Sequence, residues 1–288
     1  MSLYPSASAA AALKVTVASC AAKKQRHEKL TCLTAYDYPF ARLLDEAGMD
    51  ILLVGDSWAM ASGGEDNTLA VTMEEMLIAV RLVHRAAKRA LVVADMPYGS
   101  YHLGPRQAVR NALRMVKESG AEAVKLEGGA ARADIVHAMI AAEVPVMGHV
   151  GLTPQSVNRH GGYRVQGASP EAADQIRRDA AAVEAAGAFA LVLEGIPREL
   201  AAAITRDASI PTIGIGAGPE CDGQILVLHD LLGLSFRPRP KFVRAYADLA
   251  TVIRNAAESY RQDVESGQFP ADSESYHMPA AQAEPKWK

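Results

Sequence analysis

The chain has 288 residues, is 49% hydrophobic and carries a formal net charge of −3. This length allows one large core or two small ones, and the near-neutral charge gives no general basic surface for nucleic acid or anionic lipid. No apolar run is long enough to span a bilayer. Cys20, Cys32 and Cys221 are far apart and form no CxxC pair, so we expect no disulfide framework and a cytoplasmic location.

The two ends of the chain differ in composition from its centre. Residues 1–28 are predicted to form an arm or a leading helix, and the polar residues 267–288 a loose tail. The stretch 6–22 is rich in Ala and other small residues, as signal peptides are, but it lacks a basic n-region and Lys14 interrupts it. A cleaved signal is therefore the less favoured alternative. The catalytic domain is therefore predicted to span residues 29–266.

Short apolar runs alternate with helical segments through this central region. The predicted strands are residues 30–34, 51–55, 91–95, 123–127, 145–149, 190–194, 211–215 and 224–229. Helix starts are indicated by Asp37 and Thr72 as N-caps and by Pro105 and Pro170. A long loop is expected at 151–169 and a closing helix at 241–260. Eight such units predict a closed (β/α)₈ TIM barrel, with an open doubly wound sheet as the alternative.

Four of the predicted strands end at, or just before, an acidic residue. These acids are Asp56, Asp95, Glu127 and Glu194. In a TIM barrel the carboxyl ends of the strands form the active face, so the four side chains should converge there. Any one of them alone would be read as a helix cap or a solvated acid. Together they would repel one another at low dielectric unless a cation were bound.

Carboxylate oxygens favour Mg²⁺ as that cation. Asp56, Asp95 and Glu127 come from successive early strands and are predicted to share it, whereas Glu194 comes later and suits a general base better. Zinc is less favoured, because His149 and the later histidine His229 are isolated and no cysteine accompanies them.

Two further side chains are candidates for contacts with a substrate. Lys125 lies two residues before Glu127 and so points to the same side of its strand; it would pair with a substrate carboxylate or form a structural ion pair. His149 ends its strand and would donate to a substrate or ligand oxygen, or be a satisfied buried histidine. The glycine-rich stretch 214–218 is a weak phosphate-loop signal, and its glycines also suit a close approach of the main chain.

Several blocks of sequence resemble the ketopantoate hydroxymethyltransferase family. They are residues 34–38 (TAYDY), 54–57 (VGDS), 124–129 (VKLEGG), 148–156 (GHVGLTPQS), 161–167 (GGYRVQG), 193–194 (LE), 213–218 (IGIGAG) and 222–227 (DGQILV). The resemblance runs in order from about Leu30 to Pro270. The blocks that begin at residues 148 and 161 are the most specific to that family.

The resemblance implies a (β/α)₈ barrel of the phosphoenolpyruvate/pyruvate type that is cytoplasmic, Mg²⁺-dependent and assembled as a homodecamer of two pentameric rings. It implies transfer of a hydroxymethyl group from 5,10-methylenetetrahydrofolate to 3-methyl-2-oxobutanoate. The product would be 2-dehydropantoate, for the synthesis of pantothenate and coenzyme A.

The resemblance also assigns roles to individual residues. It implies Asp56, Asp95 and Glu127 as metal ligands and Glu194 as the base, and it implies that the substrate contacts Asp56, Ser57, Asp95 and Lys125. Tyr36 and His149 are further candidates, for contacts with the substrate or with the residues that bind it.

The chain departs from the family pattern in one loop and at one dipeptide. Glu65 stands where a His is usual and Ala70 where a Pro is usual, and Trp58-Ala59 replaces a Leu-Gly-like pair. These changes concern the order of the loop and turnover rather than the reaction. The alternatives to this function are a metal-dependent lyase or aldolase on the same barrel, although the Lys-Lys-Cys-Gly-His signature of isocitrate lyase is absent, and a non-catalytic binding barrel.

Overall fold

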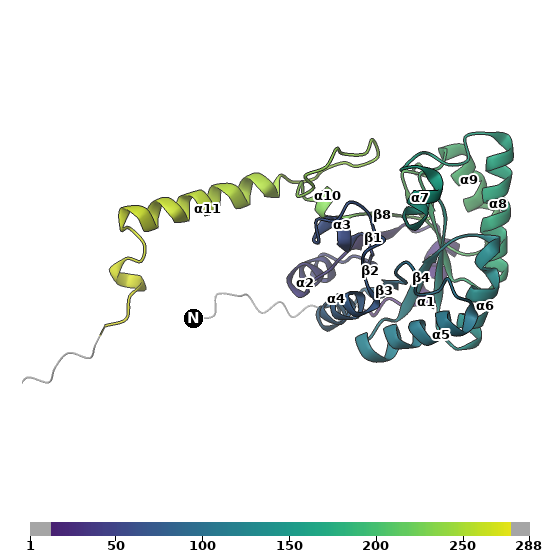
Figure 1. The fold of residues 1–288 in the computed structure, drawn as a ribbon, viewed down its shortest axis with the longest axis horizontal. Helices are drawn as coiled ribbons and strands as arrows, with labels where there is room; N and C mark the ends of the chain where they lie inside the picture. Colours follow the sequence, from purple (N-terminus) through teal and green to yellow (C-terminus); the bar gives the residue numbers. More distant parts are fainter. Residues whose placement is uncertain (1–12, 278–288) are drawn as a thin grey trace, which may run out of the picture.

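A computed structural model describes residues 13–277 of the chain. Its eight parallel strands pair in sequence order, and the first also pairs with the last, so the sheet closes into a barrel (Figure 1). The strands are β1 (Leu30–Thr34), β2 (Ile51–Val54), β3 (Leu91–Asp95), β4 (Ala123–Glu127), β5 (Val146–Gly151), β6 (Ala190–Glu194), β7 (Thr212–Ile215) and β8 (Gly223–Leu226). The predicted TIM barrel is confirmed, and the open sheet is excluded.

Helices connect most of the strands on the outside of the barrel. The α-helices are α1 (Val17–Gln25), α2 (Tyr38–Glu46), α3 (Trp58–Ala61), α4 (Met73–Ala86), α5 (Pro105–Arg114), α6 (Ala133–Ala141), α7 (Val157–His160), α8 (Pro170–Ala185), α9 (Arg198–Asp207), α10 (Leu228–Leu231) and α11 (Leu249–Ser266). A π-helical turn, η1 (Met115–Ser119), extends α5, and 3₁₀ turns lie at η2 (Ala130–Arg132), η3 (Pro154–Ser156) and η4 (Asp272–Glu274). No helix among residues 13–277 is both long enough and apolar enough to cross a membrane.

The helix starts agree with the predicted capping residues. Asp37 accepts a hydrogen bond from the Phe40 amide at 2.9 Å, and Thr72 forms a capping box with Glu75. Pro105 and Pro170 each occupy the first turn of their helices, where a missing N–H has no cost.

Three predicted elements differ from the structure. The eighth strand ends at Leu226, and the apolar residues after it form α10. The closing helix begins at Leu249 rather than at residue 241, because Asp248 supplies its N-cap. The long loop 151–169 contains η3 and α7. Much of the predicted N-terminal arm and of the C-terminal tail, residues 1–12 and 278–288, lies outside the described residues.

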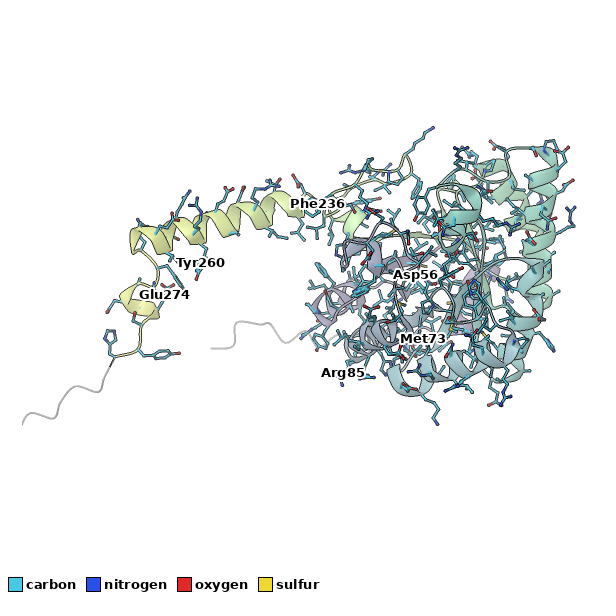
Figure 2. All side chains as sticks on the ribbon, viewed as in Figure 1. Asp56, Met73, Arg85, Phe236, Tyr260 and Glu274 are labelled. Carbon is cyan, nitrogen blue, oxygen red and sulfur yellow. The ribbon has the colours of Figure 1, made fainter. Side chains whose placement is uncertain are left out.

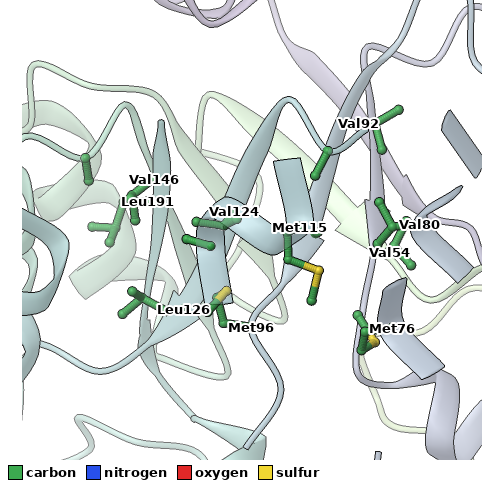
Figure 3. Close-up of a cluster of buried hydrophobic side chains, with 14 of the residues drawn as sticks. Val54, Met76, Val80, Val92, Met96, Met115, Val124, Leu126, Val146 and Leu191 are labelled. Atoms are coloured by element: carbon green, nitrogen blue, oxygen red, sulfur yellow. The ribbon is translucent and has the colours of Figure 1, made fainter. Parts of the chain in front are cut away.

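Alternation along the strands separates an inner layer of side chains from an outer one. Ile51 and Leu53 of β2 point into the barrel, whereas Leu52 and Val54 point outward against the helices. Figure 3 shows part of the outer layer, where Val54 lies near Met76 and Val80 of α4. The same period of two continues to the carboxyl end of each strand and so selects which polar side chains enter the barrel.

Helix α1 covers the amino-terminal end of the barrel. Its buried Cys20, with Val15 just before the helix, joins the inner apolar layer. Lys23 binds Asp50 and Lys24 binds Asp222, each at 2.7 Å, where those acids precede β2 and β8. A leading helix was predicted here, and its packing closes the end opposite the acidic strand ends.

The C-terminal segment extends away from the barrel. Figure 1 shows α11 projecting outward from the region of α10, and no residue of α11 is buried. In Figure 2, Tyr260 lies on this projecting arm, whereas Asp56 lies within the body of the barrel. The predicted catalytic domain, residues 29–266, therefore includes a helix, α11, that has no buried residue in the single chain.

Candidate active site

The acids identified at the strand ends enter the barrel at its carboxyl end. In β3, β4 and β6 the inward residues include Val93, Ala123 and Val192, and the same alternation places polar side chains in the next inward positions. These are Asp95, Lys125, Glu127 and Glu194. The sequence prediction that Lys125 and Glu127 share one side of their strand agrees with this alternation.

Asp95 and Lys125 form a buried ion pair in the site. They are direct neighbours in the register of β3 and β4, and Lys125 Nζ lies 2.5 Å from Asp95 Oδ1. Burial alone would lower the pKa of Lys125, but Asp95, Glu127 and Asp56 reverse this and raise the pKa above its usual value. Lys125 therefore carries a full positive charge at neutral pH.

Asp56 lies just beyond the end of β2 and is also buried. Its amide donates to Asp95 Oδ2 at 3.1 Å, which holds the two acids side by side. Burial and then the charge of Asp95 raise the pKa of Asp56 to about 7. Gly55 permits this approach, because a Cβ there would lie 2.7 Å from Ser57 Oγ and 3.3 Å from Asp95 Oδ2.

His149 lies between the other two acids. Its Nε2 is 3.2 Å from Glu194 Oε2 and its Nδ1 is 3.7 Å from Glu127 Oε1, although neither nitrogen makes a well-aligned hydrogen bond with a described residue. Burial, followed by the charge of Lys125, lowers the pKa of His149, and burial raises the pKa of Glu127 well above its usual value. Glu194 is the more accessible acid, with 16% of its side chain exposed.

Ser57 and Tyr36 form a separate pair at the edge of this cluster. The two hydroxyl oxygens are 2.9 Å apart, and Ser57 stands at the N-terminus of α3. His229, which the sequence placed near the strand ends, instead lies on α10. Its ring packs against Tyr36 and Phe40, with centroid distances of 5.5 and 6.2 Å.

Sequence reasoning assigned no role to two residues that the structure places in the cluster. Gln155 donates from its side chain to Asp56 Oδ2 at 2.8 Å and from its amide to Glu127 Oε2 at 2.9 Å. Tyr101 donates to Gln155 Oε1 at 2.6 Å. Gln155 belongs to the family-like block that begins at residue 148, and this was the one signal that could have drawn attention to it.

Comparison with known proteins identifies the family. The sequence profile described as ketopantoate hydroxymethyltransferase matches residues 14–272. The chain belongs to the ketopantoate hydroxymethyltransferase family. It is 58% identical over 266 residues to a 3-methyl-2-oxobutanoate hydroxymethyltransferase of Koribacter versatilis (strain Ellin345), covering 92% of this chain and 90% of that one. It is 55% identical over 253 residues to the protein of that name from Geobacter sulfurreducens (strain ATCC 51573 / DSM 12127 / PCA), covering 88% and 95%.

More distant solved structures share the fold of this family member. Phosphonopyruvate hydrolase superposes with a TM-score of 0.59 at 14% identity, covering 92% of each chain. A 2,3-dimethylmalate lyase of the PEP mutase/isocitrate lyase superfamily gives 0.56 at 19% identity, covering 90% of this chain and 91% of that one. These likenesses agree with the TIM-barrel fold of this chain.

The chemistry of the cluster fits a hard cation, although its side chains are not gathered around one point. No group of three or more His, Cys, Asp or Glu side chains among residues 13–277 is already arranged as a metal site. However, three buried carboxylates share one ammonium, and Asp56 Oδ1 and Glu127 Oε1 accept no hydrogen bond from the described residues. Oxygen donors with an excess of negative charge suit Mg²⁺. To bind the cation as well, Asp95 would have to share its carboxylate oxygens between the ion and the two groups that already donate to them, Lys125 Nζ and the Asp56 amide.

The loop that departs from the family pattern is anchored at its centre. The guanidinium of Arg237 donates to the main-chain oxygens of Glu65 and Asp66, the latter at 2.9 Å. Trp58 begins α3 directly after Ser57. Trp58 is thus next to a residue of the site, and none of the unusual residues belongs to the acid cluster.

Proposed function

We propose that this chain transfers a hydroxymethyl group from 5,10-methylenetetrahydrofolate to 3-methyl-2-oxobutanoate, giving 2-dehydropantoate for pantothenate and coenzyme A synthesis. Family membership supports the reaction. The observation that carries the proposed chemistry is the partly exposed Glu194 beside a buried cluster of three carboxylates and one lysine. Such a site can bind a small oxo acid and remove a proton from it.

Lys125 and Ser57 are proposed to bind the carboxylate of the substrate. Lys125 is held as a cation by Asp95, and Ser57 lies at the start of α3, where its hydroxyl contacts Tyr36. A charge-assisted bond from a buried ammonium fixes the orientation of the oxo acid more firmly than an exposed pair would. The C3 hydrogen of the substrate can then be directed at Glu194.

Glu194 is proposed as the general base. It takes the C3 proton first, and C3 of the resulting enolate then forms the new C–C bond to the methylene carbon of the folate. Both C–N bonds of that methylene group break, and water supplies the hydroxyl oxygen of the product. The two nitrogens of the leaving tetrahydrofolate gain one proton from this water and one from Glu194. His149 lies 3.2 Å from Glu194 Oε2 and restricts the position of that carboxylate. Its lowered pKa keeps it neutral at neutral pH, so it leaves the negative charge of the base in place.

Asp56, Asp95 and Glu127 are proposed to hold Mg²⁺. When bound, this ion supplies positive charge that stabilises negative charge developing on the keto oxygen of the substrate. The excess of buried carboxylates over ammonium groups supports this assignment, because uncompensated buried charge is costly.

Exchange of the C3 hydrogen tests the proposal. In D₂O with Mg²⁺, the protein should incorporate deuterium at C3 of 3-methyl-2-oxobutanoate, and added 5,10-methylenetetrahydrofolate should yield 2-dehydropantoate, both followed by NMR. Removal of divalent ions with a chelator should abolish both signals. Cleavage of a longer oxo or hydroxy acid without C3 exchange would contradict the transferase and favour a lyase.

We further propose that the protein associates with copies of itself, as a homodecamer, in the cytoplasm. Helix α11 supports self-association, because Ile253, Tyr260 and Val264 share one face and are 52%, 58% and 46% exposed. Three buried, unpaired cysteines are compatible with a reducing compartment. Sedimentation velocity should give a decamer, and the double substitution Ile253→Asp with Tyr260→Asp should give smaller species.

A further inference from the structure

We propose that Gln155 is the positioning residue of the acid cluster and that Tyr101 fixes the orientation of its side-chain amide. Together they hold Asp56 and Glu127 so that one oxygen of each carboxylate stays available to a divalent cation. This inference rests on the proposed magnesium site and adds to it two residues that contact its ligands.

Gln155 uses its side-chain amide and its main-chain N–H within the cluster. It is the middle residue of η3, only 5% exposed, and its side-chain nitrogen donates both to Asp56 Oδ2 at 2.8 Å and to the Met96 main-chain oxygen at 3.0 Å. Its main-chain N–H, which would otherwise lack a partner at the start of the 3₁₀ turn, donates to Glu127 Oε2 at 2.9 Å. One residue therefore ties together acids from two different strands.

Tyr101 determines which way the amide of Gln155 faces. Its hydroxyl lies 2.6 Å from Gln155 Oε1 and 3.4 Å from the Glu127 main-chain oxygen, and it accepts from the Glu127 amide at 3.3 Å. Because the contact with Oε1 is much the shorter of the two, the proton is directed toward Oε1. A reversed amide would place Oε1 against two acceptors, Asp56 Oδ2 and the Met96 oxygen. At 1% exposure, Tyr101 has no water to replace this bond.

The result is a fixed division of the carboxylate oxygens. Gln155 occupies Asp56 Oδ2 and Glu127 Oε2, and the described residues leave Asp56 Oδ1 and Glu127 Oε1 without a hydrogen-bond donor. Without the amide of Gln155, Asp56 would be free to rotate away from Glu127 under their mutual repulsion. Hydrogen-bond partners of metal ligands typically change metal affinity by about 10–100-fold when they are removed.

Calorimetric titration of the purified full-length chain with Mg²⁺ tests this inference. Gln155→Met keeps the size of the side chain and the main-chain bond but removes the amide, and should weaken Mg²⁺ binding by about 10–100-fold. Tyr101→Phe should weaken it by about 3–10-fold, the effect of losing one hydrogen bond. The double variant should bind Mg²⁺ as Gln155→Met does, because Tyr101 acts through Gln155.

Two controls and a stability measurement separate positioning from general damage. Tyr98→Phe removes the same atom from the same β3–α5 connection, and Gln224→Met makes the same substitution at an exposed glutamine of β8; both should leave Mg²⁺ affinity unchanged. Melting of the metal-free proteins reports the fold. A purely structural role would lower the melting temperature while the folded variant kept wild-type affinity.

The outcomes distinguish this inference from the proposed function. If the wild-type protein binds Mg²⁺ and both single variants bind it with an affinity within twofold of the wild-type value, the role of Gln155 and Tyr101 is overturned and the magnesium site is not. Independent, multiplicative effects of the two substitutions in the double variant would also overturn that role. A wild-type protein that binds no Mg²⁺ would overturn the magnesium site and this inference together. If Gln155→Met does not fold, the affinity of Tyr101→Phe decides the question.

Discussion

The two ends of the barrel place buried acids in opposite electrostatic settings. At the amino-terminal end, Asp50 binds both Lys23 and Arg89, at 2.7 and 3.1 Å, and Asp222 binds Lys24 at 2.7 Å. Each of these acids has at least one cation of its own. The end that α1 covers is therefore electrically balanced and suited to stability.

The carboxyl end has more buried negative charge than positive. Asp56, Asp95 and Glu127 share a single ammonium, that of Lys125, and Glu194 lies close by without a cation among the described residues. Burial raises the pKa of Asp56 and Glu127, whereas the pKa of Asp50 is lowered. The comparison teaches that buried acids with cations of their own suit stability, whereas an excess of buried acids suits the binding of a positively charged ligand.

The largest effect is expected from Glu194→Gln at the carboxyl end. Loss of a positioned base should lower kcat by about 10²–10⁴-fold and abolish C3 exchange, with folding and Mg²⁺ affinity nearly unchanged. Steady-state assays, exchange measured by NMR and calorimetry are the measurements. Glu199→Gln, at an exposed acid on the following helix α9, is the matched control and should retain activity. Near-normal turnover by the Glu194→Gln variant would show that Glu194 is not the general base.

A smaller effect, on stability alone, is expected from Asp50→Asn at the amino-terminal end. The substitution removes the negative charge that Lys23 and Arg89 share, and should lower the free energy of unfolding by about 1–3 kcal/mol. Both cations are about a quarter exposed, so water limits the cost. Urea denaturation measures it. A loss of kcat in the folded variant would show that the two ends are coupled.

An increase in the free energy of unfolding, rather than a decrease, is expected from the same kind of substitution at the carboxyl end, Asp56→Asn. Above pH 7, where Asp56 with its pKa of about 7 is ionised, the substitution removes a negative charge from the crowded cluster and keeps an oxygen for Gln155. It should then raise the free energy of unfolding of the metal-free protein by about 1–2 kcal/mol. The same denaturation experiment with a chelator present measures it, and Mg²⁺ affinity should fall. Destabilisation equal to that of Asp50→Asn would show that the two ends do not differ in charge balance.

The smallest expected effect is the pH dependence of the contribution that Asp50 makes to the free energy of unfolding. Burial alone would raise the pKa of Asp50, but hydrogen bonds from Lys23, the Thr31 main chain and Arg89 outweigh it and lower the pKa below its usual value. A lowered folded-state pKa gives stability that is complete above the unfolded value and is lost as pH falls through the folded value. The difference between wild type and Asp50→Asn should be constant from about pH 5 to 8 and shrink below about pH 4. A difference that grows toward acid pH would contradict this assignment.

Much of the active face was predictable from the sequence because strands impose a period of two. Once Lys125 and Glu127 are placed on one strand, their common direction follows. The acid at the end of each run predicts which face of the barrel carries the site. The end of the eighth strand was less predictable. The apolar run continues past Leu226 into α10, and hydrophobicity alone does not mark where extended backbone gives way to helix.

The sequence by itself determined the barrel, the inward acids and the family, because each depends on residues close together in the chain. The tertiary structure alone decided the partners of those acids. Gln155 reaches Asp56 across 99 positions of sequence, and Lys24 reaches Asp222 across 198. Such pairs depend on how loops and α1 fold back over the closed barrel, and the charge balance of each end follows from contacts that no local pattern encodes.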